Sequence, residues 1–213
     1  MTLQELKQLV SLGEGRTLEF KHRVPRAERI AKEVIALANT DGGRILLGVD
    51  DDGTLVGVDD AAEEAFMLRR AISQLCDPPV SYHTDRVVIG PRRDVLVVHV
   101  PESPGKPHVL RDAVESEGLA YVRVDDMSVE ASPESVRLME ERPATNGMSV
   151  SFGESESLLL SYLNDYGRVT VAEFARMADL PEEEASAILV QLTQADLLML
   201  HANRDEDFFT LSY

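Results

Sequence analysis

The sequence has little of what secreted and membrane-bound proteins depend on. With a single cysteine, it can form neither an intrachain disulfide nor a cysteine-rich zinc site. Its longest apolar runs are far too short to cross a bilayer, and its N-terminus lacks the basic start and apolar core of a signal peptide. These absences predict a cytoplasmic protein with no membrane segment.

Positive charge is also scarce, and it is unevenly spread. The net charge of −17 argues against a protein that covers nucleic acid over its whole surface. Residues 1–48 hold eight Lys and Arg against six Asp and Glu, whereas residues 148–213 hold three against twelve. We therefore expect an anionic ligand to meet the N-terminal part.

The N-terminal part contains a predicted strand, helix and strand. In the first strand polar and apolar residues alternate, so Leu18 and Phe20 should point to one face and Glu19 and Lys21 to the other. Residues 44–49 are mostly apolar and lie between turn signals, which is typical of a buried strand. This unit should group the following candidate site residues: Glu14, Glu19, Lys21 and the acidic turn 50–52.

The pattern predicts a first domain over residues 1–142 that mixes helices and strands. Residues 54–58 are expected to complete a hairpin with residues 44–49 through an Asp-Gly turn. The other expected elements are helices over 61–75 and 133–142 and strands over 80–84, 86–89, 95–100 and 120–124. The fold class is therefore α+β.

The C-terminal part predicts a second, smaller domain. Residues 143–151 lack periodicity and are interpreted as a linker. Residues 152–213 predict three helices followed by two short strands, the order of a winged helix-turn-helix. Because its third helix opens with Glu182-Glu183-Glu184, which would be repelled by phosphates, we interpret the module as a protein-contact or homodimerisation domain. The alternative is that it only packs on the first domain.

Several motifs in order resemble the Schlafen-type, Alba-like domain, a family also described as divergent AAA and as DNA-binding. The matching motifs are Glu14 with Glu19-Phe20-Lys21, Ala38-Asn39-Thr40 with Gly42-Gly43, Gly48-Val49-Asp50-Asp51 with Gly53, Val56-Gly57, Val100-Pro101-Glu102-Ser103, Pro107, and Tyr121-Val122-Arg123. The resemblance covers about residues 10–142 and implies a mixed-sheet α/β domain that binds nucleic acid, either RNA or DNA.

The resemblance also implies an RNA endonuclease with three acidic residues, which match Glu14, Glu19 and Asp51. For the third of these residues Asp50 is the alternative to Asp51. As metal ligands they would hold Mg²⁺ or Mn²⁺, since both ions prefer carboxylates and water, and Lys21 could neutralise the phosphate. From the residues alone a second interpretation stays open. In it Glu14 is a solvated loop residue, Asp51 is an ordinary turn aspartate, and Glu19 and Lys21 form an exposed charge pair.

Two features depart from what the resemblance implies. Bacterial members usually carry a small glycine-serine turn after the Tyr-Val-Arg motif, whereas this chain has Asp125-Asp126, which would repel a phosphate. The AAA description implies ATP, but the chain has no P-loop motif, so we predict no ATP binding.

A group of basic residues follows the first predicted strand. Arg23, Arg26, Arg29 and Lys32, spaced by three, would lie along one side of the second helix and contact phosphates. The resemblance adds Arg123 to the candidate nucleic-acid contacts. The alternative is a solvated helix face whose cations pair with Glu28 and Glu33.

Other polar residues are assigned structural roles or none. Gly42 and Gly43 are expected to end a helix and form a tight turn, while Asn39 could serve either structure or function. The histidines show no ligand spacing and are assigned no metal.

Two hypotheses from different classes therefore remain. The first is a Schlafen-like nucleic-acid-binding protein that also acts as a metal-dependent ribonuclease. The second is a catalytically inert transcriptional or regulatory protein that dimerises or binds a protein partner through its winged helix. The positions of Glu14, Glu19 and Asp51 in the folded chain should favour one of them.

Overall fold

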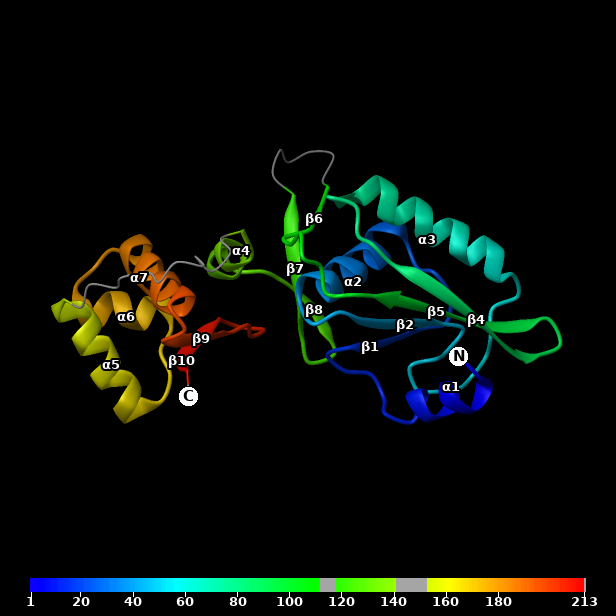
Figure 1. Ribbon diagram of the computed structural model, residues 1–213, viewed down its shortest axis with the longest axis horizontal. Coiled ribbons are helices and arrows are strands. Elements are labelled where there is room, and N and C mark those ends of the chain that lie inside the picture. Colours follow the sequence, from blue (N-terminus) through cyan, green and yellow to red (C-terminus); the bar gives the residue numbers. More distant parts are fainter. Residues whose placement is uncertain (112–117, 141–152, 213) are drawn as a thin grey trace. The chain divides into compact units, whose positions relative to one another are not determined.

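The computed structural model describes residues 1–111, 118–140 and 153–212 (Figure 1). The chain divides into two units, Met1–Glu130 and Ala131–Tyr213. The sequence predicts that the first domain ends at residue 142. In the structure helix α4 (Pro133–Glu140) belongs to the second unit instead. The expected linker at 143–151 lies outside the described residues.

A four-stranded mixed sheet organises the first unit. Its strands lie in the order β1 (Leu18–Lys21), β2 (Gly43–Leu47), β5 (Arg93–Val100) and β4 (His83–Gly90). Strands β1 and β2 are parallel, because helix α2 (Ala27–Asn39) connects them, and the other pairs are antiparallel. This arrangement confirms the α+β fold class.

Helices cover both faces of this sheet. Helix α1 (Leu3–Val10) lies on one side, and α2 and α3 (Ala61–Leu75) lie on the other (Figure 1). Leu18 and Phe20 pack with Leu6 of α1 in one core, as their alternation predicted. The opposite face carries the larger core, which includes Ile30 and Val34 of α2.

A second four-stranded sheet packs against α2. Its strands lie in the order β3 (Cys76–Asp77), β6 (Val109–Leu110), β7 (Leu119–Val124) and β8 (Met127–Glu130). The turn between β7 and β8 is the Asp125-Asp126 pair, and Asp125 has a φ of 52°. The β7 strand of this hairpin packs against α2.

Three expected strands differ in the structure. Residues 54–58 pair with residues 44–49 at a single antiparallel bridge, Val49 to Leu55, and Val58 instead pairs with Asp94, so the predicted hairpin is reduced to its turn. The other strands of the sheet explain this, because β2 already pairs on both edges with β1 and β5. The two short strands expected at 80–84 and 86–89 are one strand, β4.

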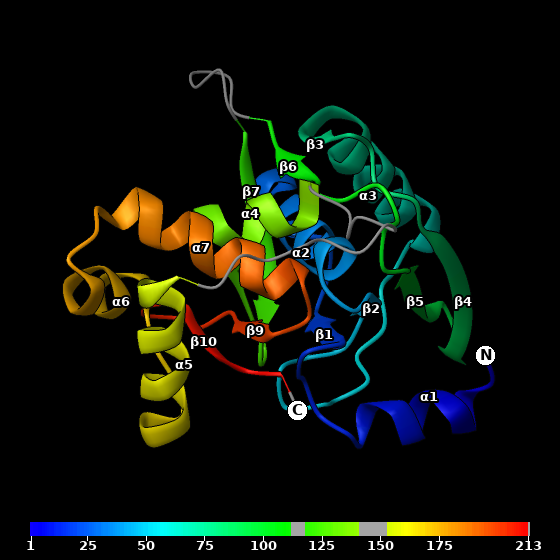
Figure 2. The same ribbon diagram turned by 60° about the vertical axis from the view of Figure 1, so that its left-hand side comes forward.

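The second unit consists mainly of helices. Three of them, α5 (Glu154–Tyr166), α6 (Val171–Ala178) and α7 (Glu182–Gln194), precede the antiparallel pair β9 (Leu198–His201) and β10 (Phe208–Leu211). This is the expected order of elements, and the assignment to the winged-helix fold stays a prediction. Within this unit α7 lies beside α4 (Figure 2). Across the described ranges, every helix is too short or too polar to cross a membrane.

Asn39 and Gly42 have structural roles at the end of α2. Asn39 is buried, and its amide group donates to the carbonyls of His108 and Tyr121 at 2.8 and 3.0 Å and accepts from the His108 amide at 2.7 Å. Gly42 has a φ of 70°, and a Cβ there would lie 2.5 Å from the Glu102 backbone nitrogen. Glycine is therefore required at position 42 by both conformation and space.

Replacing Gly42 should destabilise the fold far more than replacing an unconstrained glycine. We expect Gly42→Ala to lower the free energy of unfolding by about 3 kcal/mol, because strain and a backbone clash combine. Gly13→Ala is the matched control: its φ is 76°, but nothing lies within 4 Å of the added carbon, so the cost should be about 1 kcal/mol. Urea unfolding of both variants measures the difference, and equal losses would contradict it.

Candidate functional site

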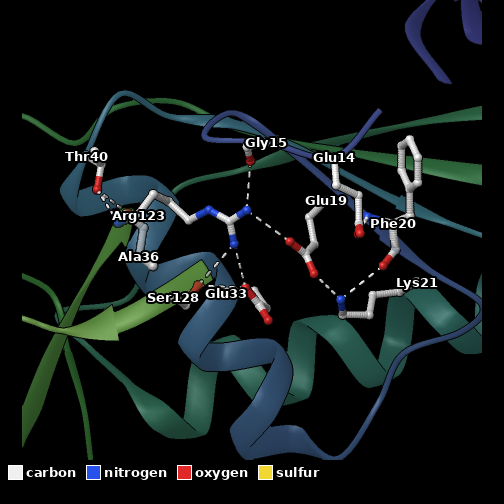
Figure 3. Close-up of polar contacts among 10 residues, drawn as sticks. All are labelled: Glu14, Gly15, Glu19, Phe20, Lys21, Glu33, Ala36, Thr40, Arg123 and Ser128. Carbon is white, nitrogen blue, oxygen red and sulfur yellow. Dashed lines mark hydrogen bonds and ion pairs between the residues drawn. The ribbon is translucent and has the colours of Figure 1, made fainter. Parts of the chain in front are cut away.

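Glu19 and Lys21 of β1 face α2, on the opposite side of the sheet from Phe20 (Figure 3). The Glu19 side chain is only 7% exposed. Its carboxylate forms an ion pair with the Lys21 ammonium, which also donates to the Phe20 carbonyl at 3.0 Å. The predicted charge pair is therefore present, but it is buried rather than exposed.

The second cation at Glu19 is Arg123 of β7, which is fully buried. One terminal nitrogen of its guanidinium lies 3.0 Å from a Glu19 oxygen and donates to the Gly15 carbonyl at 2.8 Å. The other donates to Glu33 of α2 at 2.9 Å and to Ser128 of β8 at 3.2 Å (Figure 3). Arg123 thus ties both sheets to α2.

The environment of Glu19 opposes its ionisation. Burial raises the pKa of Glu19 above its ordinary value, and the negative charge of Glu33 raises it further. Lys21 and Arg123 act in the opposite direction but do not compensate fully. Glu19 therefore depends on its two cations to remain ionised, and each of its oxygens lies in an ion pair, although Oε2 accepts no hydrogen bond among the described residues.

Glu14 forms a hydrogen bond with the backbone of β1. The half-buried carboxylate accepts a hydrogen bond from the Phe20 amide at 2.8 Å, which closes the turn before the strand (Figure 3). Asp51 is exposed in the turn after β2 and lines a cavity of about 520 Å³ together with Phe20. Because Phe20 and Glu19 point to opposite faces, Asp51 lies on the side of the sheet away from Glu19.

The structure does not bring the acidic trio together as a metal site. Among the residues that the structure describes, no three His, Cys, Asp or Glu side chains are grouped so that they could hold a metal ion. A divalent cation at Glu19 would also lie beside the charges of Lys21 and Arg123 and would be repelled. This arrangement of Glu14, Glu19 and Asp51 does not fit Mg²⁺ or Mn²⁺.

The prediction that Arg123 contacts nucleic acid is wrong. Its side chain is 0% exposed, and four protein groups surround its guanidinium, so no phosphate can reach it. Sequence alone could not show this, because Arg123 lies at the end of a strand where an exposed position is equally compatible with the pattern.

The basic residues before α2 are arranged differently from the prediction. The helix begins at Ala27, so Arg23 lies in the preceding loop and Arg26 is the N-cap residue rather than part of a helical face. Arg23, Arg26 and Arg29 are nonetheless all exposed. Within residues 1–111, 118–140 and 153–212, none of the three forms an ion pair.

The alternative of paired surface charges is therefore not observed at these arginines. Glu33, one of the two expected partners, is bonded to Arg123 instead. Lys32 differs from the arginines, since it is half-buried and its ammonium lies 4.8 Å from the centroid of the Tyr121 ring. The exposed group consists of three arginines without Lys32.

The sequence patterns do not identify the hydrogen-bond partners of Arg123. Glu33 and Ser128 share a hydrogen bond of 2.6 Å, and the Thr40 hydroxyl accepts from the Arg123 amide at 2.9 Å. The only available signal was that Arg123 faces Ser128 across a hairpin whose turn is Asp125-Asp126. The contact with Glu33 spans 90 positions and depends on how the sheet packs on α2.

Removing Arg123 should strongly destabilise the first unit. Arg123→Met keeps most of the volume but leaves Glu19 and Glu33 buried without their cation, so we expect a loss of about 3–5 kcal/mol. The control is Arg69→Met on the exposed side of α3, which should change stability by less than about 0.5 kcal/mol. Urea unfolding measures both, and similar values for the two variants would show that the Arg123 contacts contribute little.

Comparison with known proteins identifies a family for this chain. A family model described as Schlafen, AlbA_2 matches residues 14–132, more than half of the chain. No curated protein matches. Among solved structures, the DIP2311 protein from Corynebacterium diphtheriae is 17% identical with a TM-score of 0.45, over 92% of this chain and 34% of that one. This chain therefore spans about a third of that protein's length.

A second similar structure covers a smaller share of this chain. It is the N-terminal domain of a protein described as related to the ATP-dependent DNA helicase RecG, from Nitrosomonas europaea. The identity is 24% and the TM-score 0.40, over 58% of this chain and 89% of that domain. The family match rests on residues 14–132, which include β1, α2, β2 and the Arg123 network. The chain belongs to the Schlafen, AlbA_2 family.

Proposed function

We propose that the first unit binds nucleic acid through Arg23, Arg26 and Arg29, which we call the arginine ridge. The observation that carries this proposal is that all three are exposed and unpaired within the described residues of a protein with a net charge of −17. An acidic protein gains nothing in solubility from three free arginines in one place. Membership of the Schlafen, AlbA_2 family supports the same function.

The start of α2 adds to the positive potential of the ridge. Arg26 makes no side-chain cap, so the first amides of the helix point outward with the positive end of its dipole. Two carboxylates reduce this potential: Glu28 in the first turn, and Glu64, which accepts from the Val24 amide at 2.6 Å. The three arginines outnumber them.

The ridge is suited to the phosphate backbone rather than to base edges. Guanidinium groups bind phosphates in a bidentate manner, and such contacts position a nucleic acid without reading its sequence. We therefore propose binding of RNA or DNA with little sequence preference and a marked dependence on salt.

We propose further that this binding occurs without cleavage. The support is that Glu19 is occupied by Lys21 and Arg123, and that Glu14 is bonded to the β1 backbone. Both groups act as structural supports of the strand. This favours the inert, regulatory hypothesis over the metal-dependent ribonuclease.

For the second unit we propose a winged-helix module that contacts protein rather than nucleic acid. Helix α7 begins with three exposed glutamates, and its buried Ser186 donates to Glu134 of α4, which covers one face of the helix. On α5, Leu158 and Tyr166 are 41% and 70% exposed. Homodimerisation through this unit stays a prediction.

Neutralising the ridge should weaken nucleic-acid binding and its salt dependence. For Arg23→Gln/Arg26→Gln/Arg29→Gln we expect at least about a tenfold loss of affinity at low salt. The slope of log K against log salt concentration should become shallower by about 2–3, because three phosphate contacts are lost. Fluorescence anisotropy with a short labelled RNA, and with DNA of the same sequence, measures both quantities.

The control carries the same charge change at other exposed arginines: Arg92→Gln/Arg176→Gln/Arg204→Gln. It should keep at least half of the wild-type affinity. Equal losses in the two triple variants would mean that only net charge matters, and undetectable binding by the wild type would overturn the proposed function.

Incubation with Mn²⁺ tests the absence of cleavage. We expect wild-type protein to leave structured RNA intact, because the acidic side chains do not converge on one ion. Gel analysis of end-labelled RNA measures this. Cleavage that disappears in Glu14→Gln or Asp51→Asn, both of which leave the Arg123–Glu19 pair in place, would establish the ribonuclease instead.

A further inference from the structure

Three basic side chains form a row across the first sheet, on the face that α1 covers in part. Arg44 of β2 lies opposite His99 of β5, and His99 lies opposite His83 of β4. Arg44 has the same orientation as Leu46, which packs in the core beneath α1. The row therefore lies on the opposite face from α2, and it takes no part in the contacts of the arginine ridge.

The three side chains touch one another. Nε of Arg44 lies 3.4 Å from Nδ1 of His99, and the rings of His83 and His99 stack with centroids 4.4 Å apart and an interplanar angle of 4°. Nε2 of His99 lies 3.1 Å from the Asp85 carboxylate. With Arg44 donating to Nδ1, the His99 proton is placed on Nε2, where it donates to Asp85.

The row borders an open cleft of about 320 Å³. Arg44, His83 and His99 line it together with the backbone turn at Gly42 and Gly43. Arg44 and His83 are exposed, and the His99 side chain is 18% exposed. The ring nitrogens of His83 have no hydrogen-bond partner in the part of the chain that the structure describes, so they are available to a ligand.

The carboxylates nearest the cleft are already paired. Asp41, which lines it, forms an ion pair with Arg16. Asp85 interacts with His99 and with the Met1 amino group, at 3.1 and 3.9 Å. Without the Met1 amino group, these groups and Arg44 sum to zero while the imidazoles are neutral, and the sum becomes positive when either imidazole is protonated.

Two further acidic residues from neighbouring segments, Glu5 and Glu102, also have partners. Glu5 of α1 lines the adjacent cavity with Arg44, and its carboxylate accepts from the Thr2 amide. Glu102, which follows β5, pairs with Lys106 at 2.7 Å. No other carboxylate among the lining residues of the cleft competes for Arg44 or the two imidazoles.

We propose that Arg44, His83 and His99 form a second anion site, which binds a phosphate group more tightly as the pH falls. A phosphate presents several acceptor oxygens and up to two negative charges, which matches the Arg44 guanidinium and the ring nitrogens of His83 as donors, while His99 adds positive charge when it is protonated. The phosphate belongs either to a small phosphorylated molecule or to a nucleic-acid chain.

The direction of the pH dependence follows from the His99 environment. Burial lowers the pKa of His99 below its ordinary value, and the positive charges of His83 and Arg44 lower it further, although Asp85 acts in the opposite direction. A bound anion would favour the charged imidazole and raise that pKa. Binding therefore takes up protons, and affinity must rise as the pH falls through the range in which the histidines titrate.

This site goes beyond the proposed function and does not rest on it. The arginine ridge lies at the start of α2, whose 13 residues extend about 20 Å before Gly42 is reached. The two groups share no residue and lie on opposite faces of the sheet. If the binding experiment fails at one of the two sites, the proposal for the other site is unaffected.

The test uses the full chain with sulfate as the probe, because the charge of sulfate is constant over the pH range. We expect sulfate to shift the ring resonances of His83 and His99 saturably at about pH 6, with affinity at least about fivefold weaker at about pH 8. Two-dimensional NMR of the histidine rings, at constant ionic strength maintained with chloride, follows this. His22 and His201 are internal controls.

Variants separate the site from general charge effects. Arg44→Gln and His83→Gln, both at exposed positions, should each abolish the saturable shift at His99, whereas Arg92→Gln at the β4–β5 turn should retain it. Thermal unfolding confirms that the variants are folded. Absence of a saturable shift in the wild type, or an unchanged shift in folded Arg44→Gln, would overturn the proposal.

A second arm identifies the source of the phosphate. Inorganic phosphate, a nucleoside monophosphate and a dinucleotide with one phosphodiester are compared at about pH 6. Tighter binding of either of the first two indicates a small phosphorylated ligand, and tighter binding of the dinucleotide indicates a nucleic-acid chain. Binding of sulfate but of none of the three would refute a phosphate site.

Discussion

The buried guanidinium of Arg123 is the interaction on which the first unit depends. It lies at 0% exposure and contacts four groups that come from the turn before β1, from β1 itself, from α2 and from β8. A charge removed from water to this extent is tolerated only when it is paired and hydrogen-bonded. The positions of Glu19 and Glu33 are therefore set by Arg123, and the two sheets cannot separate without exposing an unpaired ion.

This constraint also decides what the acidic residues do. The alternation of β1 sends Glu19 to the α2 face and Phe20 to the α1 face, so Asp51, which lines a cavity with Phe20, is separated from Glu19 by the sheet. Glu19 is occupied by two cations, and Glu14 supports the backbone. Two of the three acids, Glu14 and Glu19, therefore support the architecture.

Two local groups of basic side chains lie at the surface of the first unit. The arginine ridge at the start of α2 and the row of Arg44, His99 and His83 lie on opposite faces of one sheet. Each is a local positive region in a protein with a net charge of −17. Under the proposed functions, long-range repulsion of polyanions and short-range attraction at these two places would together restrict binding to the two regions rather than to the whole surface.

The sequence by itself determined the elements that depend on local pattern. The alternation of Leu18 and Phe20 against Glu19 and Lys21, the α+β class and the helix–helix–helix–strand–strand order of the second unit all follow from periodicity and turn residues, and the structure has them. The exposed positions of Arg23, Arg26 and Arg29 could be expected from the same pattern, although the point at which the helix begins could not.

Only the tertiary structure decided which charged groups meet. The burial of Arg123 depends on a contact with Glu33 across 90 positions, and the row of Arg44 and His99 depends on the pairing of β2 with β5. The hairpin expected at residues 54–58 is limited to one bridge, because both edges of β2 are taken by strands distant in sequence or joined through a helix. Local periodicity says which way a side chain points, but the partner that it meets is selected by how sheets and helices pack.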